Sequence, residues 1–221
     1  MSATFKLEWD KTGERYYETG TDRGVIYPQV AGAYPKGAAW NGLISVTKSP
    51  SGAEFTPLYA NNHKYANLQS AEEFACTIEA YTYPDEFAAC NGELEAIPGV
   101  RVGQQPRVPF GMCYRNFIGN DAEGTEAAYK INLIYGAQAA PSEETDTTIN
   151  DSPEAKTMSW ECETTPVNIT GFKPTATLVI DSRTVDAEKL AAFEAVIYGS
   201  GETEARLPLP DEVVELLGIA G

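Results

Sequence analysis

The sequence is poor in histidine, and this shortage excludes the commonest hydrolase chemistry. His63 is the only histidine among 221 residues, and it lies in the polar, turn-like run 61–64. A Ser-His-Asp triad would have to use this residue, and no Gly-x-Ser-x-Gly or Cys-His signature accompanies it. We therefore expect His63 to be a solvated loop residue.

Basic residues are also few. The chain has 16 lysines and arginines against 32 aspartates and glutamates, a formal net charge of −16. Such a surface repels phosphate backbones and anionic lipids, which disfavours ordinary nucleic-acid binding and membrane adsorption. No phosphate-binding loop or dinucleotide fingerprint is present, so we expect no cofactor. The chain can still enclose nucleic acid without binding it.

Long apolar runs and paired cysteines are missing as well. No stretch approaches eighteen apolar residues, and the first ten residues lack the apolar core of a signal peptide, so we expect a chain made in a cytosol. The four cysteines form no Cys-x-x-Cys pair, and their spacing supplies no closed zinc site. We expect no metal and free, mostly buried thiols at Cys76, Cys90, Cys113 and Cys162.

What the sequence does contain is short apolar stretches with a period of two, separated by 19 glycines and 14 prolines. This punctuation is typical of many strands joined by turns. The predicted class is mainly β, an antiparallel β-sandwich or barrel in a single domain over 1–221. Alternation marks 74–81, 129–137, 158–163 and 176–181, and further strands are expected at 41–48, 54–60 and 109–118.

One flanking α-helix is predicted at 186–198. Asp186 can cap its N-terminus and Gly199 can end it. One face of this helix carries Leu190, Phe193, Val196 and Ile197, which indicates packing on the sheet. Shorter helical turns are expected after Pro84 and Pro210.

Two long segments lack periodicity and are expected to be loops, at about 20–40 and 140–153. Structureless loops longer than about 12–15 residues are uncommon in compact domains unless they bind something or become ordered on assembly. These loops therefore point to partners.

Paired carboxylates raise the hypothesis of a glycoside hydrolase. Glu79 with Asp85 or Glu86, or Glu161 with Glu163, would supply the two acids that such an enzyme needs. Because 32 acids in 221 residues produce such pairs by chance, a solvated strand face is the favoured interpretation, and we expect no catalytic residues and no enzyme.

Several stretches, taken together and in order, resemble the major tail (tail tube) proteins of long, flexible-tailed bacteriophages and prophages. The resemblance spans nearly the whole chain, and no single motif in it is catalytic or diagnostic. The stretches are 9–20 (Trp-Asp-Lys-Thr-Gly-Glu-Arg-Tyr-Tyr-Glu-Thr-Gly), 24–28, 39–43, 51–54, 58–62, 71–74, the distinctive 77–87 (Thr-Ile-Glu-Ala-Tyr-Thr-Tyr-Pro-Asp-Glu-Phe), 114–115, 119–121, 150–153 and 172–176.

The resemblance implies a β-sandwich with a flanking helix, assembled as hexameric rings that stack into a hollow tube. It implies a structural virion protein, made and assembled in the host bacterial cytoplasm and located in the virion tail. The expected partners are other copies of the chain and the tape measure, tail tip and tail terminator proteins. DNA would pass through the lumen without specific binding, with no role for a membrane.

The resemblance also places the channel-lining strands early, in the hairpin-like region 42–60 and 64–83. The channel-lining candidates are Glu54, Glu73 and Glu79. A charge of −16 per chain gives −96 for a ring of six, and acids on the wall would repel the duplex.

The alternative function is a soluble carbohydrate-binding β-sandwich module. The chain has 12 tyrosines, which could form a platform for stacking on sugars. Tyr81 and Tyr83 are expected to share a face, and Tyr16 and Tyr17 to lie near Tyr27.

Overall fold

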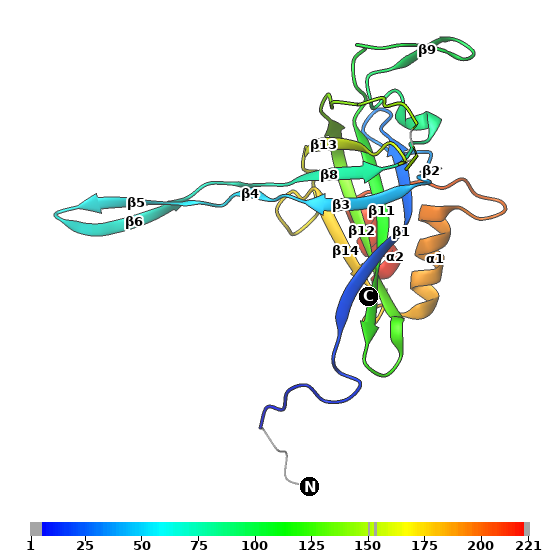
Figure 1. The fold of residues 1–221 in the computed structure, drawn as a ribbon. Coiled ribbons are helices and arrows are strands. Elements are labelled where there is room, and N and C mark those ends of the chain that lie inside the picture. The colour runs from blue at the N-terminus through cyan, green and yellow to red at the C-terminus, as the bar shows by residue number, and fades with distance from the viewer. Residues whose placement is uncertain (1–5, 150, 153, 219–221) are drawn as a thin grey trace.

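The computed structural model describes residues 6–149, 151–152 and 154–218, and the protein is mainly β, as the sequence predicts. Figure 1 shows a body of strands and helices from which a long hairpin projects. The elements are β1 (Tyr17–Pro28), β2 (Ala38–Ala39), β3 (Leu43–Lys48), β4 (Ser51–Gly52), β5 (Phe55–Ala60), β6 (His63–Gln69), β7 (Glu72–Glu73), β8 (Ala75–Ala80), η1 (Asp85–Phe87), β9 (Leu94–Ile97), β10 (Val100–Val102), β11 (Phe110–Asn120), β12 (Gly124–Ala139), β13 (Met158–Thr164), β14 (Thr177–Asp181), α1 (Ala187–Tyr198) and α2 (Pro210–Leu217).

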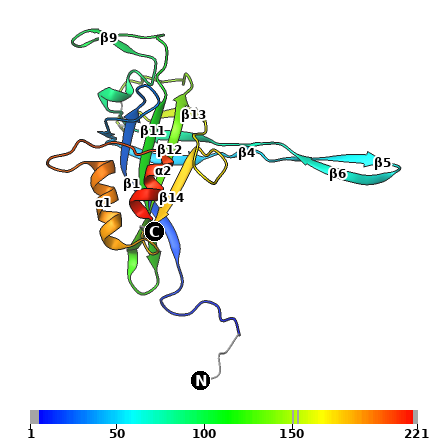
Figure 2. The ribbon, with the colours of Figure 1, turned by 180° about the vertical axis from the view of Figure 1, so that it is seen from behind.

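The body has three layers, and β12 connects two of them. All strand pairs of the main sheet are antiparallel, in the order β2-β1-β11-β12-β13-β8-β3. The 130–134 part of β12 pairs with β14, whereas its end at 137–139 pairs with β13. The sheet therefore folds over into a layer of β3, β8 and β13 and a layer of β1, β11, β12 and β14. The helices form the third layer behind the second (Figures 1 and 2).

The first core fills the space between the two strand layers and is dominated by aromatic rings. Trp160 and Phe87 are fully buried, with ring centroids 5.1 Å apart, and Trp40 packs on Phe87 at 4.7 Å. Such tilted and edge-to-face contacts add to the free energy gained from burial. The alternating apolar side chains of β8 and β13, Cys76, Ile78, Ala80 and Cys162, face this core.

The second core lies between the middle layer and the helices. Phe193 and Ile197 of α1 are fully buried against Tyr27 of β1 and Leu133 of β12. Because both faces of the middle layer are covered, β12 is buried continuously from residue 131 to residue 137 instead of alternating. Asn132, on the face opposite Leu133, is therefore only 2% exposed.

Gly136 lies where β12 passes from one layer to the next. Its φ is +59°, and a Cβ at this position would overlap the carbonyl oxygen of Thr165. Its N–H donates to the Tyr34 hydroxyl at 2.9 Å, and its carbonyl accepts from Thr165 N at 2.9 Å. Only glycine has both the left-handed conformation at low cost and the space for this bend.

The predicted helix is confirmed, including its cap. The Asp186 carboxylate accepts from the backbone N–H groups of Glu188 and Lys189, and Gly199 follows the last turn at φ +81°. The turn predicted after Pro84 is the short 3₁₀ helix η1, and the turn after Pro210 is the two-turn helix α2. No helix in the described ranges is long and apolar enough to cross a membrane.

The prediction of a loop at 20–40 is wrong for residues 20–28 and for the two residues of β2. Residues 20–28 belong to β1, and Val25, Ile26 and Tyr27 are buried. Two register shifts, between Thr19 and Asp22 and between Asp22 and Val25, interrupt the ladder with β11 and hide the strand period in the sequence. The other expected loop has no helix or strand at 140–149, and residues 150 and 153 lie outside the described residues.

The expectation of free, buried thiols is confirmed for all four cysteines. Cys76 and Cys162 are direct cross-strand partners in β8 and β13, and both face the first core. Burial raises the pKa of Cys90 and of Cys113 to about 12, so these thiols are protonated at neutral pH.

Candidate assembly interface

The most conspicuous feature of the molecule is a two-stranded arm formed by residues 49–74. The strands β3 and β8 leave the body side by side and continue through the pairs β4–β7 and β5–β6. Figures 1 and 2 show this arm extending far beyond the body. The hairpin-like region expected at 42–60 and 64–83 is thus a hairpin, but its outer half pairs with no strand of the main sheet.

Local sequence explains both the turn and the bend of the arm. At the tip, Asn61 and Asn62 have φ values of +50° and +62°, a two-residue turn of the kind that twists with its flanking strands. At the base, Gly52 has φ +76° and a Cβ there would overlap the Ala71 carbonyl. His63 is exposed at the tip, as expected for a solvated histidine.

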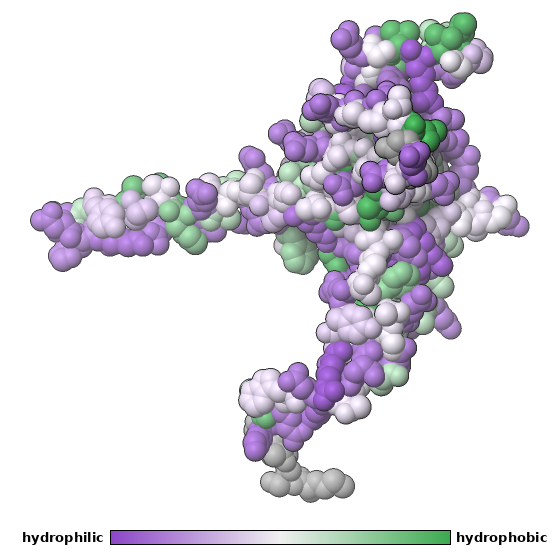
Figure 3. All heavy atoms as spheres, in the orientation of Figure 1, coloured by the Kyte–Doolittle hydropathy of each residue, from purple (hydrophilic) through white to green (hydrophobic). Residues whose placement is uncertain are grey.

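No other part of the described chain packs over the arm. Every residue from 49 to 73 is exposed except Ala53 and Ala66, which are half-buried. Large apolar side chains nevertheless lie on the surface of the arm, and Figure 3 shows apolar and polar residues mixed along it. They are Phe55, Leu58, Tyr59, Tyr65 and Leu68. A two-stranded hairpin is at best marginally stable by itself in water, so this arm fits a role in contact with another molecule.

A second notable surface is the outer face of the β3-β8-β13 layer, which we call the acidic face. No element of the described chain forms a further layer over it (Figure 1). Cross-strand pairing places Glu79 between Ser45 and Ser159, and Glu161 beside Thr77. The face consists of Ser45, Thr47, Ala75, Thr77, Glu79, Ser159, Glu161 and Glu163, all of them neutral or acidic.

The three channel-lining candidates do not form one cluster. Glu54 and Glu73 belong to the arm and are exposed, whereas Glu79 lies on the acidic face, half-buried, and accepts a hydrogen bond from Ser45 Oγ at 2.9 Å. Glu161 and Glu163 share the face with Glu79, and sequence reasoning did not place them there. Their alternation along 158–163 was visible, but their pairing with β8 was not.

Lys48 is turned away from the acidic face. It pairs with Cys76, an inward residue of β8, and its Nζ donates to Asn132 Oδ1 at 2.6 Å. Burial of the ammonium group lowers the Lys48 pKa. Asn132 in turn donates to Asn116 Oδ1 at 2.7 Å, so the lysine extends a chain of hydrogen-bonded polar side chains.

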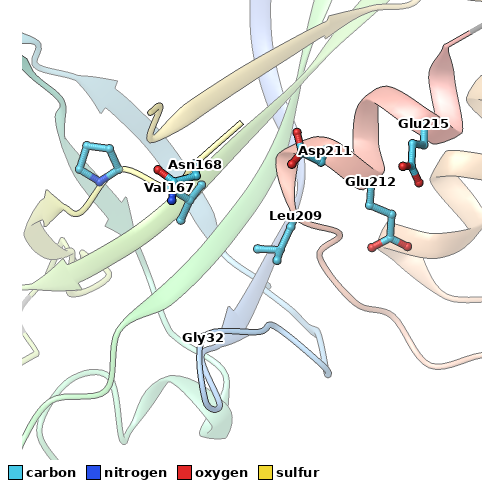
Figure 4. A pocket seen from close by; sticks show the side chains of 8 residues that line it. Gly32, Val167, Asn168, Leu209, Asp211, Glu212 and Glu215 are labelled. Carbon is cyan, nitrogen blue, oxygen red and sulfur yellow. The ribbon is translucent and has the colours of Figure 1, made fainter. Parts of the chain in front are cut away.

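An open groove of about 700 Å³ lies beside α2. Figure 4 shows carboxylates on its rim, but two are held by the chain itself. Asp211 Oδ1 accepts a hydrogen bond from Thr170 N at 2.7 Å, and Glu212 forms a bidentate ion pair with Arg206 at 2.5 and 2.9 Å. The guanidinium lowers the Glu212 pKa, so this acid stays ionised and paired. Within the described residues, no group of three or more His, Cys, Asp or Glu is arranged to hold a metal ion.

The carboxylate pairs considered for a glycoside hydrolase are also accounted for. Asp85 accepts from Arg101 at 2.5 Å on η1, and Glu79 is engaged by Ser45 on the acidic face. Glu161 and Glu163 are exposed on one strand and line neither the groove at α2 nor the hollow between α1 and the start of β12. These positions fit the solvated-face interpretation.

The two tyrosine groupings named for a sugar-binding platform are not formed, which corrects the sequence interpretation. Tyr81 is exposed, but the Tyr83 ring packs edge-on against Trp160 and Phe87, with centroids 5.7 Å apart in both cases. The chain leaves the strand after Ala80, so the period of two no longer applies to these tyrosines. Tyr27 is fully buried, and its hydroxyl donates to the Ile197 carbonyl at 2.5 Å, so it cannot join Tyr16 and Tyr17 on a surface.

A scan against protein-family models finds none that matches this chain, and a search of the curated proteins finds no match either.

Proposed function

We propose that this chain is a structural virion protein that assembles as stacked hexameric rings and forms the tail tube of a long-tailed bacteriophage. The tube would be the conduit through which DNA passes into the host. The proposal combines the collinear resemblance of the sequence with two surfaces that suit self-assembly and a DNA channel.

The arm is the observation that carries the proposal. The arm spans 26 residues in two paired strands, and with its apolar side chains exposed it gains little stability in a single subunit. Packing on a neighbouring copy would bury Phe55, Leu58 and Leu68 and stabilise the hairpin at the same time. Because the contact joins an arm to a different surface, it is heterologous and generates rings or open filaments.

The acidic face suits the wall of a DNA channel. It contributes three carboxylates per chain, from Glu79, Glu161 and Glu163, and therefore eighteen in a ring of six. Lysine or arginine on the wall would attract phosphates and slow the passage of the duplex, whereas carboxylates repel it. In this arrangement Glu54 and Glu73, which belong to the arm, would serve subunit contacts instead of the lumen.

A tube has a wall, a lumen and two ends, and each of these would contact a different partner. Copies of this chain would contact each other along the tube, a tape measure protein would occupy the lumen during assembly, and tail tip and tail terminator proteins would bind the ends. Assembly would take place in the bacterial cytoplasm, and the mature location would be the virion tail.

The experiment that tests the proposal removes the arm without disturbing the body. Residues 53–71 are replaced by Asn-Gly, which closes Gly52 onto Glu72 with a two-residue hairpin turn. The arm buries almost nothing, so the melting temperature should change by less than about 3 °C, equivalent to roughly 1 kcal/mol.

The wild type should form rings and tubes by electron microscopy, favoured by salt because like charges are screened, and the armless variant should remain monomeric. Asn62→Gly, which keeps the turn and the arm, is the matched control and should assemble normally. Wild-type protein that stays monomeric at high concentration and high salt would contradict the proposal, and so would tubes formed without the arm.

A further inference from the structure

Two of the four free cysteines lie directly across from each other in the sheet. Cys76 of β8 and Cys162 of β13 are register partners, although they are 86 positions apart in the sequence. Both side chains point into the first core, where they are 2% and 1% exposed. Neither of the other two faces a cysteine across a strand pair: Cys90 follows η1, and Cys113 lies in the second core with its thiol 3.2 Å from the Tyr27 hydroxyl.

The backbone hydrogen bonds around Cys76 define the geometry of the pair. Ser49 N donates to the Ala75 carbonyl at 2.8 Å, so the N–H and C=O groups of Cys76 point away from β3 and toward Cys162. The Cα atoms of such a hydrogen-bonded antiparallel pair lie about 5.5 Å apart, within the range of about 4.4–6.8 Å that disulfides span. The two thiols also interact with each other, and this hydrogen bond, together with burial, raises the pKa of Cys162.

We propose that Cys76 and Cys162 are a disulfide site that closes when the protein meets a disulfide oxidant of the oxidised-glutathione class. When local opening exposes the pair, the thiolate of one cysteine attacks a glutathione sulfur and releases one reduced glutathione. The thiolate of the other cysteine then attacks the mixed disulfide and releases the second glutathione. Two cysteine thiols and one oxidised glutathione thereby become one protein disulfide and two reduced glutathiones.

The crosslink would join the two strands that carry the acidic face. Glu79 and Glu161 belong to the same β8–β13 ladder and lie on the side opposite the two thiols. A reducing cytosol would keep the site open, whereas oxidising surroundings would close it. The closed form restricts the unfolded chain between residues 76 and 162, which stabilises the native sheet. Because the crosslink forms within one subunit, it does not depend on the proposed assembly.

The test uses the full-length wild type. Reduced protein is equilibrated with oxidised and reduced glutathione at a urea concentration within the unfolding transition, where the buried thiols are transiently exposed, and is then returned to native buffer. Alkylation in denaturant should count two free thiols instead of four, and a non-reducing peptide map should link Cys76 to Cys162. The melting temperature should rise by about 5–15 °C and return to its original value when dithiothreitol reduces the crosslink.

Two variants serve as controls. Cys90→Ala removes the third thiol of the same core and should still form the crosslink with the same rise in melting temperature, whereas Cys76→Ala should show no rise. Four free thiols, glutathione attached to single cysteines, or a link to Cys90 or Cys113 would overturn the proposal. A crosslinked protein that melts at or below the temperature of the reduced one would overturn it as well. All of these measurements are made on single subunits, so their failure would leave the proposed function in place.

Discussion

The docking of α1 on the middle layer can be tested at Phe193, whose side chain is completely buried in the second core. Phe193→Asp places a carboxyl among Tyr27, Leu133 and Ile197, all of which are fully buried. Ala192, the preceding residue of the helix, is exposed, so Ala192→Asp introduces the same charge one position away on the solvent-facing side. The pair of variants separates the effect of burial from the effect of charge on the helix.

The magnitude follows from two contributions. Truncating a buried phenylalanine costs about 3–5 kcal/mol. Keeping the new carboxyl protonated at pH 7, about three pH units above its ordinary pKa, costs roughly another 4 kcal/mol. The sum, about 7–9 kcal/mol, is comparable to the whole stability of a typical domain, about 5–15 kcal/mol. Ala192→Asp should cost less than about 1 kcal/mol, mainly through helix propensity.

The assay is thermal unfolding followed by circular dichroism, with the soluble fraction after expression as a second readout. Phe193→Asp should be insoluble or unfolded, and Phe193→Ala should melt roughly 6–20 °C below the wild type. Ala192→Asp should be soluble and melt within a few degrees of it. A soluble Phe193→Asp protein with the wild-type melting temperature would refute the packing of α1 described above.

Three other expectations concern the channel, the bend of β12 and alkaline stability. Glu79→Lys should leave assembly intact but slow DNA ejection from virions that carry it, most strongly at low salt; ejection at the wild-type rate at every ionic strength would remove Glu79 from the lumen. Gly136→Ala should lower the free energy of unfolding in urea by at least about 1–2 kcal/mol, since it combines a left-handed φ with an overlap on Thr165, and an unchanged midpoint would contradict the geometry. Burial raises the Tyr27 pKa, so the folded protein keeps this hydroxyl protonated while the unfolded chain ionises above about pH 10; stability should therefore fall above that pH, and less steeply in Tyr27→Phe if this residue is responsible.

The elements of this fold that sequence reasoning predicted are those fixed by local patterns. The cap of α1 needs only Asp186 and its own first turn, and the alternation along β8 and β13 needs only the two faces of a strand. The strand hidden in 20–28 was missed because two bulges and the glycines of β1 break the period, although the run Val25-Ile26-Tyr27 was an apolar signal.

The arm and the acidic face depend on contacts that are distant in sequence. Residues 54–60 have the composition of an ordinary strand, and the local sequence does not indicate that this strand lies outside the packed layers. Likewise, Glu79 and Glu161 share a surface only because β8 pairs with β13, which lies about eighty residues further along the chain. Sequence reasoning could name Glu79 as a candidate for the lumen, but it could not separate it from Glu54 and Glu73.

The arm also has a consequence for how the chain folds. The strands β3 and β8 are adjacent in the sheet but separated by 26 residues, and closing such a loop costs conformational entropy. The tight turn at Asn61–Asn62 starts a ladder that runs back along the arm to these two strands, so each new pair brings the next one together. The arm adds almost no buried surface to the native subunit. Strand pairing that starts at its tip and proceeds toward the body can nevertheless set the register of β3 and β8, and so of the layer that carries the acidic face.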